Sequence, residues 1–196
     1  WLEFRRVLFR STIHKIILVA LMFGTSIGYA KEINFKKVIK IEFKNVKKGH
    51  ELRIKDENGE TFYSREIQTS GNYSKLFNFS SLENGLYTAE LHKDFEINIY
   101  KFKVKNGLVS YFEKSDFNVF KPVIRSEKNL LYISKLAFNK ETLDILIYYK
   151  DKVIMNETMK GDGILNRIYK LSESQKGDYK IIINSENRIF KKEFTL

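Results

Sequence analysis

An internal repeat is the feature that most limits what this chain can fold into. Residues 52–104 align without a gap on residues 144–196 when they are moved forward by 92 positions. Identical residues recur along the aligned segments, namely Gly71 with Gly163, Ser80 with Ser172, Gly85 with Gly177, Tyr87 with Tyr179, Ile97 with Ile189 and Phe102 with Phe194. Because a repeat of fixed period sets the architecture of a protein, the sequence predicts two tandem copies of one module.

Alternating apolar and polar residues predict that both modules are built from strands. Ile39, Ile41 and Phe43 alternate with polar residues, which is the period of a strand with one buried face. The pairs Asn58-Gly59 and Asn106-Gly107 predict hairpins with type I′ turns, in which both central residues have positive φ. The predicted fold is all-β: two tandem immunoglobulin-like antiparallel β-sandwiches after an N-terminal signal peptide helix.

The N-terminal segment is predicted to be removed before the protein functions. Residues 1–11 lack a starting Met and resemble translated cloning sequence, so we interpret them as a non-native extension. Residues 12–30 have a basic lead, an apolar run over 16–27 and small residues at the end, as in a signal peptide cleaved between Ala30 and Lys31. An apolar run of 12 residues is shorter than the roughly 20 that a membrane-spanning helix needs, and an uncleaved anchor is the alternative.

The remaining chain divides into two domains, residues 31–120 and residues 121–196. A linker is predicted over residues 115–128, which contain the only proline, Pro122, a residue that cannot donate to a sheet ladder. Within the first domain the apolar positions change phase, from Ile97 and Ile99 to Phe102 and Val104. This change predicts a bulge or a strand that passes from one sheet to the other.

Composition excludes several classes of function. The chain has no cysteine, which excludes a disulfide framework, a thiolate zinc site and a cysteine nucleophile. The formal net charge is +11, and without residues 1–30 the chain retains 31 basic and 23 acidic residues. The excess favours solubility, with attraction to an anionic surface, a glycan or a nucleic acid as the alternative. No nucleic-acid-binding motif is present, so we expect no nucleic acid partner.

No arrangement of residues predicts a catalytic, cofactor or metal site, and we expect that the protein is not an enzyme. His50 and His92 lack converging ligands at a suitable spacing and are interpreted as surface residues. Tyr87 and Tyr179 each follow a Gly by two residues, which is typical of a corner tyrosine with a packed ring and a hydroxyl bonded to the backbone.

One motif resembles a known family. The first copy reads Phe77-Asn78-Phe79-Ser80-Ser81-Leu82-Glu83-Asn84-Gly85-Leu86-Tyr87, and the second keeps Tyr169-Lys170-Leu171-Ser172 and Gly177-Asp178-Tyr179. The pattern resembles immunoglobulin-like modules of proteins exported by Bacteroidota, including the C-terminal sorting domains of type IX secretion cargo. The resemblance implies an exported protein in the periplasm, on the outer surface or in the medium.

Three functions agree with these observations. The first is a non-catalytic structural or interaction protein of the periplasm or cell surface, with an unknown protein or glycan as its partner at the cell envelope. In the second, the second module is a sorting domain that directs export of the first. In the third, exposed aromatic residues, Tyr111 and Phe112, bind a glycan or another ligand. Contact with a membrane is expected only through the signal peptide before its cleavage.

Overall fold

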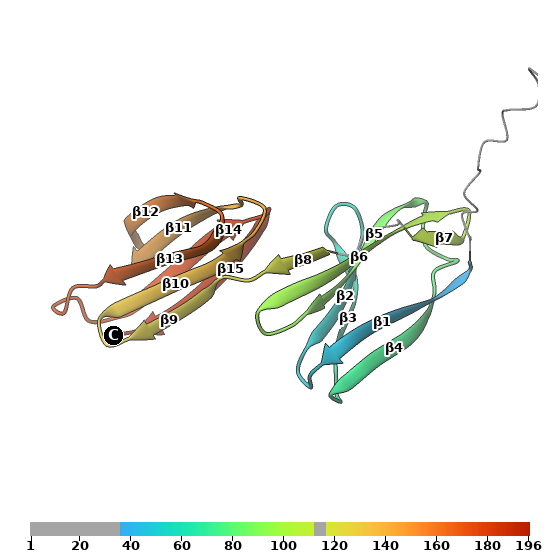
Figure 1. Cartoon of the computed structure of the whole chain (residues 1–196), viewed down its shortest axis with the longest axis horizontal. Coiled ribbons are helices and arrows are strands. Elements are labelled where there is room, and N and C mark those ends of the chain that lie inside the picture. Colours follow the sequence, from blue (N-terminus) through green and yellow to red (C-terminus); the bar gives the residue numbers. More distant parts are fainter. Residues whose placement is uncertain (1–35, 112–116) are drawn as a thin grey trace, which may run out of the picture. The chain divides into compact units, whose positions relative to one another are not determined.

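The computed structural model describes residues 36–111 and 117–196, and these residues form antiparallel sheets without a helix (Figure 1). The prediction of an all-β fold is therefore confirmed. The extension over residues 1–11, the signal peptide over residues 12–30 and the cleavage site between Ala30 and Lys31 lie outside the described residues, and these assignments stay predictions.

The first sandwich packs a two-stranded sheet against a larger one. The small sheet pairs β1 (Val38–Val46) with β4 (Gly71–Asn78). The larger sheet has the order β3-β2-β5-β6-β7, and β8 also pairs with β6. Its strands are β2 (Glu51–Lys55), β3 (Thr61–Glu66), β5 (Gly85–His92), β6 (Glu96–Lys105), β7 (Leu108–Tyr111) and β8 (Phe117–Phe120). Ile41 and Phe43 of the small sheet share one buried cluster with Leu52 and Phe102 of the larger sheet.

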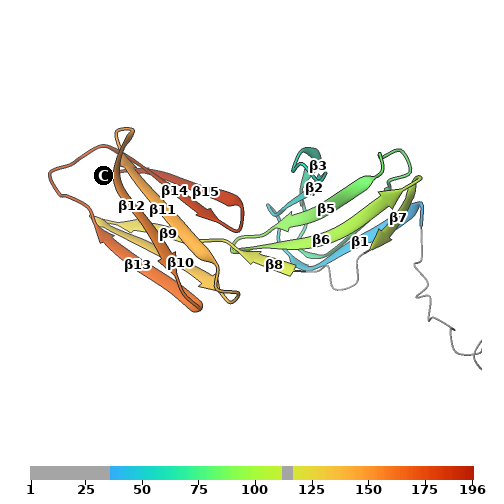
Figure 2. The ribbon, with the colours of Figure 1, turned by 90° about the horizontal axis from the view of Figure 1, so that it is seen from above.

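The second sandwich packs a three-stranded sheet against a four-stranded sheet (Figure 2). The smaller sheet has the order β13-β10-β9 and consists of β9 (Val123–Glu127), β10 (Leu130–Ala137) and β13 (Gly163–Lys170). The larger sheet has the order β12-β11-β14-β15 and consists of β11 (Thr142–Tyr149), β12 (Lys152–Lys160), β14 (Asp178–Ser185) and β15 (Arg188–Thr195). Leu131 and Ile133 of the smaller sheet are buried together with Ile145 and Ile181 of the larger one.

The two sandwiches share one topology, offset by the period of the sequence repeat. The order β3-β2-β5-β6 of the first corresponds to β12-β11-β14-β15 of the second, and β4-β1 corresponds to β13-β10. The strands β4 and β13 begin at Gly71 and Gly163, which both have positive φ, at 126° and 88°. Glycine adopts such a backbone without the steric cost that a Cβ brings, and this explains why the repeat keeps glycine there.

Both predicted corner tyrosines occur in the structure. The hydroxyl of Tyr87 donates to the carbonyl of Glu83 at 3.0 Å, and that of Tyr179 donates to the carbonyl of Gln175 at 2.9 Å. Each ring is buried and stacks on the phenylalanine that matches in the repeat, with centroid distances of 5.6 Å from Tyr87 to Phe102 and 5.5 Å from Tyr179 to Phe194. Each tyrosine therefore joins the turn before a central strand to the core.

The chain passes from one set of sheets to the other at Lys121 and Pro122. Strand β8 pairs with β6 of the first sandwich, and β9 pairs with β10 of the second. The prediction that residues 115–128 form a linker was wrong for most of this segment, because backbone pairing makes strands even where the apolar pattern is weak. Pro122 lies between the two ladders, as expected of a residue that has no N–H to donate.

One of the two predicted type I′ turns has a different geometry. Asn106 and Gly107 both have positive φ, at 52° and 69°, which confirms that turn. In the other turn only Gly59 has positive φ, at 84°. The carboxylate of Asp56 accepts hydrogen bonds from the backbone N–H groups of Asn58 and Glu60 at 3.0 and 2.8 Å. These local bonds favour the observed turn, in which Asn58 keeps a negative φ, over the type I′ turn.

The predicted bulge or change of sheet in β6 is also wrong. The strand pairs with β5 in an uninterrupted register from Ile97 to Val104. Ile97 and Ile99 face away from the sandwich core and form a separate buried cluster with Val119 of β8. The apolar positions change phase because β6 buries one face in its first half and the other face in its second half.

Glu90 is a carboxylate buried in the ladder of β5. Its side chain lies 3.0 Å from Nε2 of His92 and 2.9 Å from Nζ of Lys55, and it accepts from Arg188 at 2.5 and 3.2 Å. Burial by itself would raise the pKa of Glu90, but the hydrogen bonds from His92, Arg188 and Lys55 outweigh it and hold the pKa far below 4.5. Glu90 is therefore ionised in the folded protein at neutral pH.

Replacing the corner tyrosine of the second sandwich tests the contribution of its hydroxyl. We expect Tyr179→Phe to lower the free energy of unfolding by about 1 kcal/mol, because the stacked ring remains and one hydrogen bond is lost. Tyr148→Phe is the matched control, since no hydrogen bond from its hydroxyl occurs among the described residues, and a change within about 0.5 kcal/mol is expected. Urea denaturation measures both, and equal values would contradict the assigned role.

Removing the charge of Glu90 tests the ionic cluster. We expect Glu90→Gln to lower the free energy of unfolding at pH 7 by about 3 kcal/mol, because it leaves the half-buried Lys55 and Arg188 without their buried counter-ion. The control Glu42→Gln removes an exposed carboxylate and should have an effect below about 1 kcal/mol.

The Glu90→Gln variant should also change how the free energy of unfolding depends on pH. Because the pKa of folded Glu90 lies below 4.5, its stabilisation is complete above pH 4.5 and is lost as the pH falls below that value. Urea denaturation between pH 7 and pH 3 should therefore show a smaller loss for Glu90→Gln than for the parent protein. Parallel curves for the two proteins would be evidence against this account.

Candidate functional site

The structure describes only one of the two aromatic residues predicted to bind a ligand. Tyr111 is the last residue of β7, and its side chain is 47% exposed. Its hydroxyl donates to the backbone carbonyl of Lys40 at 3.0 Å, and this bond ties the end of β7 to β1. Phe112 lies outside the described residues. A paired aromatic site at these positions stays a prediction.

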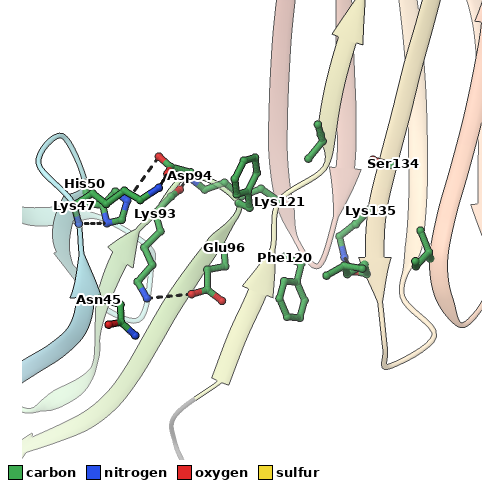
Figure 3. A pocket seen from close by; sticks show the side chains of 14 residues that line it. Asn45, Lys47, His50, Lys93, Asp94, Glu96, Phe120, Lys121, Ser134 and Lys135 are labelled. Carbon is green, nitrogen blue, oxygen red and sulfur yellow. Dashed lines mark hydrogen bonds and ion pairs between the residues drawn. The ribbon is translucent and has the colours of Figure 1, made fainter. Parts of the chain in front are cut away.

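A different group of polar residues gathers at one end of the first sandwich, where the β1–β2 and β5–β6 turns meet. Figure 3 shows Lys47, His50 and Asp94 pointing toward one another on the wall of a pocket. The backbone N–H of Lys47 donates to Nδ1 of His50 at 3.1 Å, and Nζ of Lys47 donates to Asp94 at 2.8 Å. Nε2 of His50 lies 3.7 Å from Oδ1 of Asp94. The three side chains thereby join two turns that are distant in sequence.

The hydrogen bond to Nδ1 decides how His50 carries its proton. A neutral imidazole that accepts at Nδ1 must carry its hydrogen on Nε2, which is the atom that faces Asp94. This Nε2 is buried and has no hydrogen-bond partner among the described residues. Burial lowers the pKa of His50 below 6.5, while Asp94 acts in the opposite direction. Near neutral pH the residue is therefore an uncharged N–H donor beside a carboxylate.

The prediction that His50 lies on the surface was wrong. Only 5% of the residue is exposed, because the turn folds it inward. Gly49 has a φ of 91°, its N–H donates to the carbonyl of Ile67, and the carbonyl of His50 accepts from the N–H of Ile67. His92 is not fully exposed either, since it bonds to Glu90. The inward position of His50 depends on Ile67, which is distant in the sequence, and no local pattern indicates it.

The described residues contain neither a metal-binding cluster nor a membrane-spanning helix. Residues 36–111 and 117–196 contain no group of three or more His, Cys, Asp or Glu side chains placed to hold a metal ion. Among those same residues no helix is long and apolar enough to cross a membrane. Lys47, His50 and Asp94 form a contact that joins the β1–β2 turn to the β5–β6 turn.

Comparison with solved structures found matches of low similarity. A BSP domain of a biofilm associated protein is 10% identical, with a TM-score of 0.28, and the match covers 82% of this chain and 27% of that one. The ligand-binding domain of human OSCAR is 6% identical, with a TM-score of 0.24, and covers 81% and 89% of the two chains. Extracellular domains 3–5 of Drosophila OTK are 10% identical, with a TM-score of 0.23, and cover 82% and 92%. At these TM-scores the likeness supports no conclusion about function.

Comparison with protein families gave a match to the first sandwich. No curated protein matches the chain. Residues 35–105 match the family described as the Secretion system C-terminal sorting domain. The match begins just before β1 and ends with the last residue of β6, so it covers β1 to β6. This segment is therefore similar to the β-sandwiches of secretion sorting domains, and the similarity indicates an exported protein.

Proposed function

We propose that this chain is an exported, non-catalytic protein of the bacterial cell envelope that uses type IX secretion. The observation that carries the proposal is the match of residues 35–105 to the sorting-domain family. The predicted signal peptide over residues 12–30 would supply the first export step, and the sorting module the second. A chain without cysteines suits this route, because its stability depends on apolar cores instead of disulfides.

The position of the match distinguishes the two copies. The sequence led us to consider the second module as the sorting domain, but the matched residues lie in the first copy. We therefore assign sorting to the first sandwich and interaction with a partner to the second. The alternative is that the second sandwich directs sorting and the first binds the partner, because the second copy has the same strand order as the matched segment. The partner is proposed to be a protein or a glycan at the cell envelope.

Loops and sheet surfaces are the parts of a sandwich that recognise partners. The contacts among Lys47, His50 and Asp94 hold two turns of the first sandwich in a fixed arrangement. A fixed arrangement lowers the entropy that a recognition surface loses on binding. These contacts support a role for that end of the first sandwich in recognition by the secretion machinery.

Reporter fusions test which copy directs export. A fluorescent protein with a secretory signal would be joined to residues 31–120, to residues 121–196 or to residues 31–196, in a bacterium that has type IX secretion. We expect the first and third fusions on the surface or in the medium and the second in the periplasm. The second sandwich is a matched control, because it has the same topology and a similar length.

A secretion-deficient strain of the same bacterium should retain all three fusions in the periplasm. Intact mass would show in addition whether the full chain is cut between residues 115 and 128. Export of the 121–196 fusion alone would reverse the assignment of the two copies. Periplasmic retention of every fusion in the secreting strain would refute type IX export.

A further inference from the structure

The outer face of the sheet β13-β10-β9 carries several apolar side chains, although it lies outside the core of the second sandwich. Along β10 the buried residues alternate with Leu130, Tyr132, Ser134 and Leu136, which form the outer face. On the neighbouring strand β13, Ile164 and Ile168 are 63% and 61% exposed. The outer face is defined here by these six residues together with Val123, Arg125 and Glu127 of β9 and Asn166 and Lys170 of β13.

The first sandwich provides an internal control for this face. Moving back by 92 positions places Lys40 where the second copy has Tyr132, Lys44 where it has Leu136, and Asn72 where it has Ile164. The corresponding face of the first copy is mixed: Lys40 forms an ion pair there with Glu42, while Val38 and Leu76, at the places of Leu130 and Ile168, are exposed apolar residues. Two copies of one architecture therefore differ at matched outward positions. Solubility favours the polar version, so the apolar version needs another explanation.

The register of the strands places the outward residues in rows across the sheet. Lys170, Leu130 and Glu127 form the first row, and Ile168, Tyr132 and Arg125 form the second. Asn166, Ser134 and Val123 form the third row, and Ile164 and Leu136 form the fourth. One row thus carries opposite charges on its two sides with an apolar residue between them.

This pattern of charge is complementary to itself. When a second copy packs face to face about a two-fold axis parallel to β10, β13 of one copy lies over β9 of the other. Lys170 then faces Glu127 of the second copy, and the reverse pair forms by symmetry. Leu130, Tyr132 and Leu136 lie over the same residues of the second copy. An axis across the strands would instead place the charged row over Ile164 and Leu136.

We propose that the outer face of β9, β10 and β13 is a self-association surface through which two copies of this protein form an isologous dimer. The two sheets pack with their strands aligned within about 30°, as the sheets of a sandwich do. The apolar rows supply the favourable burial, and the exchanged pairs of Lys170 with Glu127 set the orientation. This proposal goes beyond secretion, because it does not depend on which copy directs export.

The size of the face predicts a weak dimer. Eight residues of β10 extend over roughly 27 Å, and three strands about 4.8 Å apart give a width of roughly 14 Å. The area is therefore about 400 Å² per copy, which is half of the roughly 800 Å² typical of a stable interface. Association should appear as the concentration rises into the micromolar to millimolar range.

Sedimentation equilibrium of residues 31–196 over that range tests the proposal. We expect a reversible equilibrium between monomer and dimer in the parent protein. The double substitution Tyr132→Lys with Leu136→Lys gives the second copy the residues of the first and should raise the dissociation constant at least tenfold. Circular dichroism would confirm that the variant keeps its fold, which is expected because both side chains lie outside the core.

A matched pair of single variants distinguishes dimerisation through this face from non-specific association of exposed apolar residues. Ile168→Lys in the second copy should weaken dimerisation, whereas Leu76→Lys at the equivalent position of the first copy should not. Leu76 is 66% exposed, so the two changes are chemically alike. Equal effects of the two variants, or a parent protein that stays monomeric to the highest concentration, would overturn the proposal.

Charge exchange tests the orientation of the dimer. Glu127→Lys and Lys170→Glu should each weaken association, because each places like charges over one another across the two-fold axis. The double variant Glu127→Lys with Lys170→Glu should restore the parent dissociation constant. If the double variant is as weak as the single ones, the two-fold axis parallel to β10 is wrong.

Discussion

The hydrogen bond from a corner tyrosine to the carbonyl four residues earlier is the constraint that both sandwiches share. Its ring is buried against a phenylalanine of the next strand, while its hydroxyl holds the turn that leads into the central strand. Because a buried hydroxyl needs a partner, ring and turn can only be placed together. The contact thus fixes the turn that precedes β5 and the turn that precedes β14.

The common frame leaves the two copies free to differ at their surfaces. The turn that contains His50 in the first copy corresponds to the start of β11 in the second. His50 and Asp94 join two turns by side chains, whereas the hydroxyl of Ser185 donates to the carbonyl of Thr142 at the matching place. The outer sheet face differs at some matched positions, with Lys40 and Lys44 in the first copy where the second has Tyr132 and Leu136. Function belongs to these surfaces, since the frame is shared.

Sequence reasoning reached the fold because alternation and repetition are local signals. It placed the corner tyrosines correctly, since each needs only a turn before a strand. It failed for His50, whose turn is bonded to Ile67, and it gave no indication of the buried Glu90, whose partners include Arg188. It also failed for the phase change in β6, where Val119 covers one face. In each case the deciding neighbour is distant in the chain, and its position follows only from packing.

The sequence alone determined the all-β class, the 92-residue repeat and the resemblance of its motif to sorting modules. Side-chain alternation and glycine at positive φ act on single residues and their neighbours, so they can be read along the chain. Tertiary structure alone decided which residues share a row on β9, β10 and β13, and which charges are buried. Rows arise from the pairing of strands, and burial arises from the packing of sheets, so neither exists before the chain has folded.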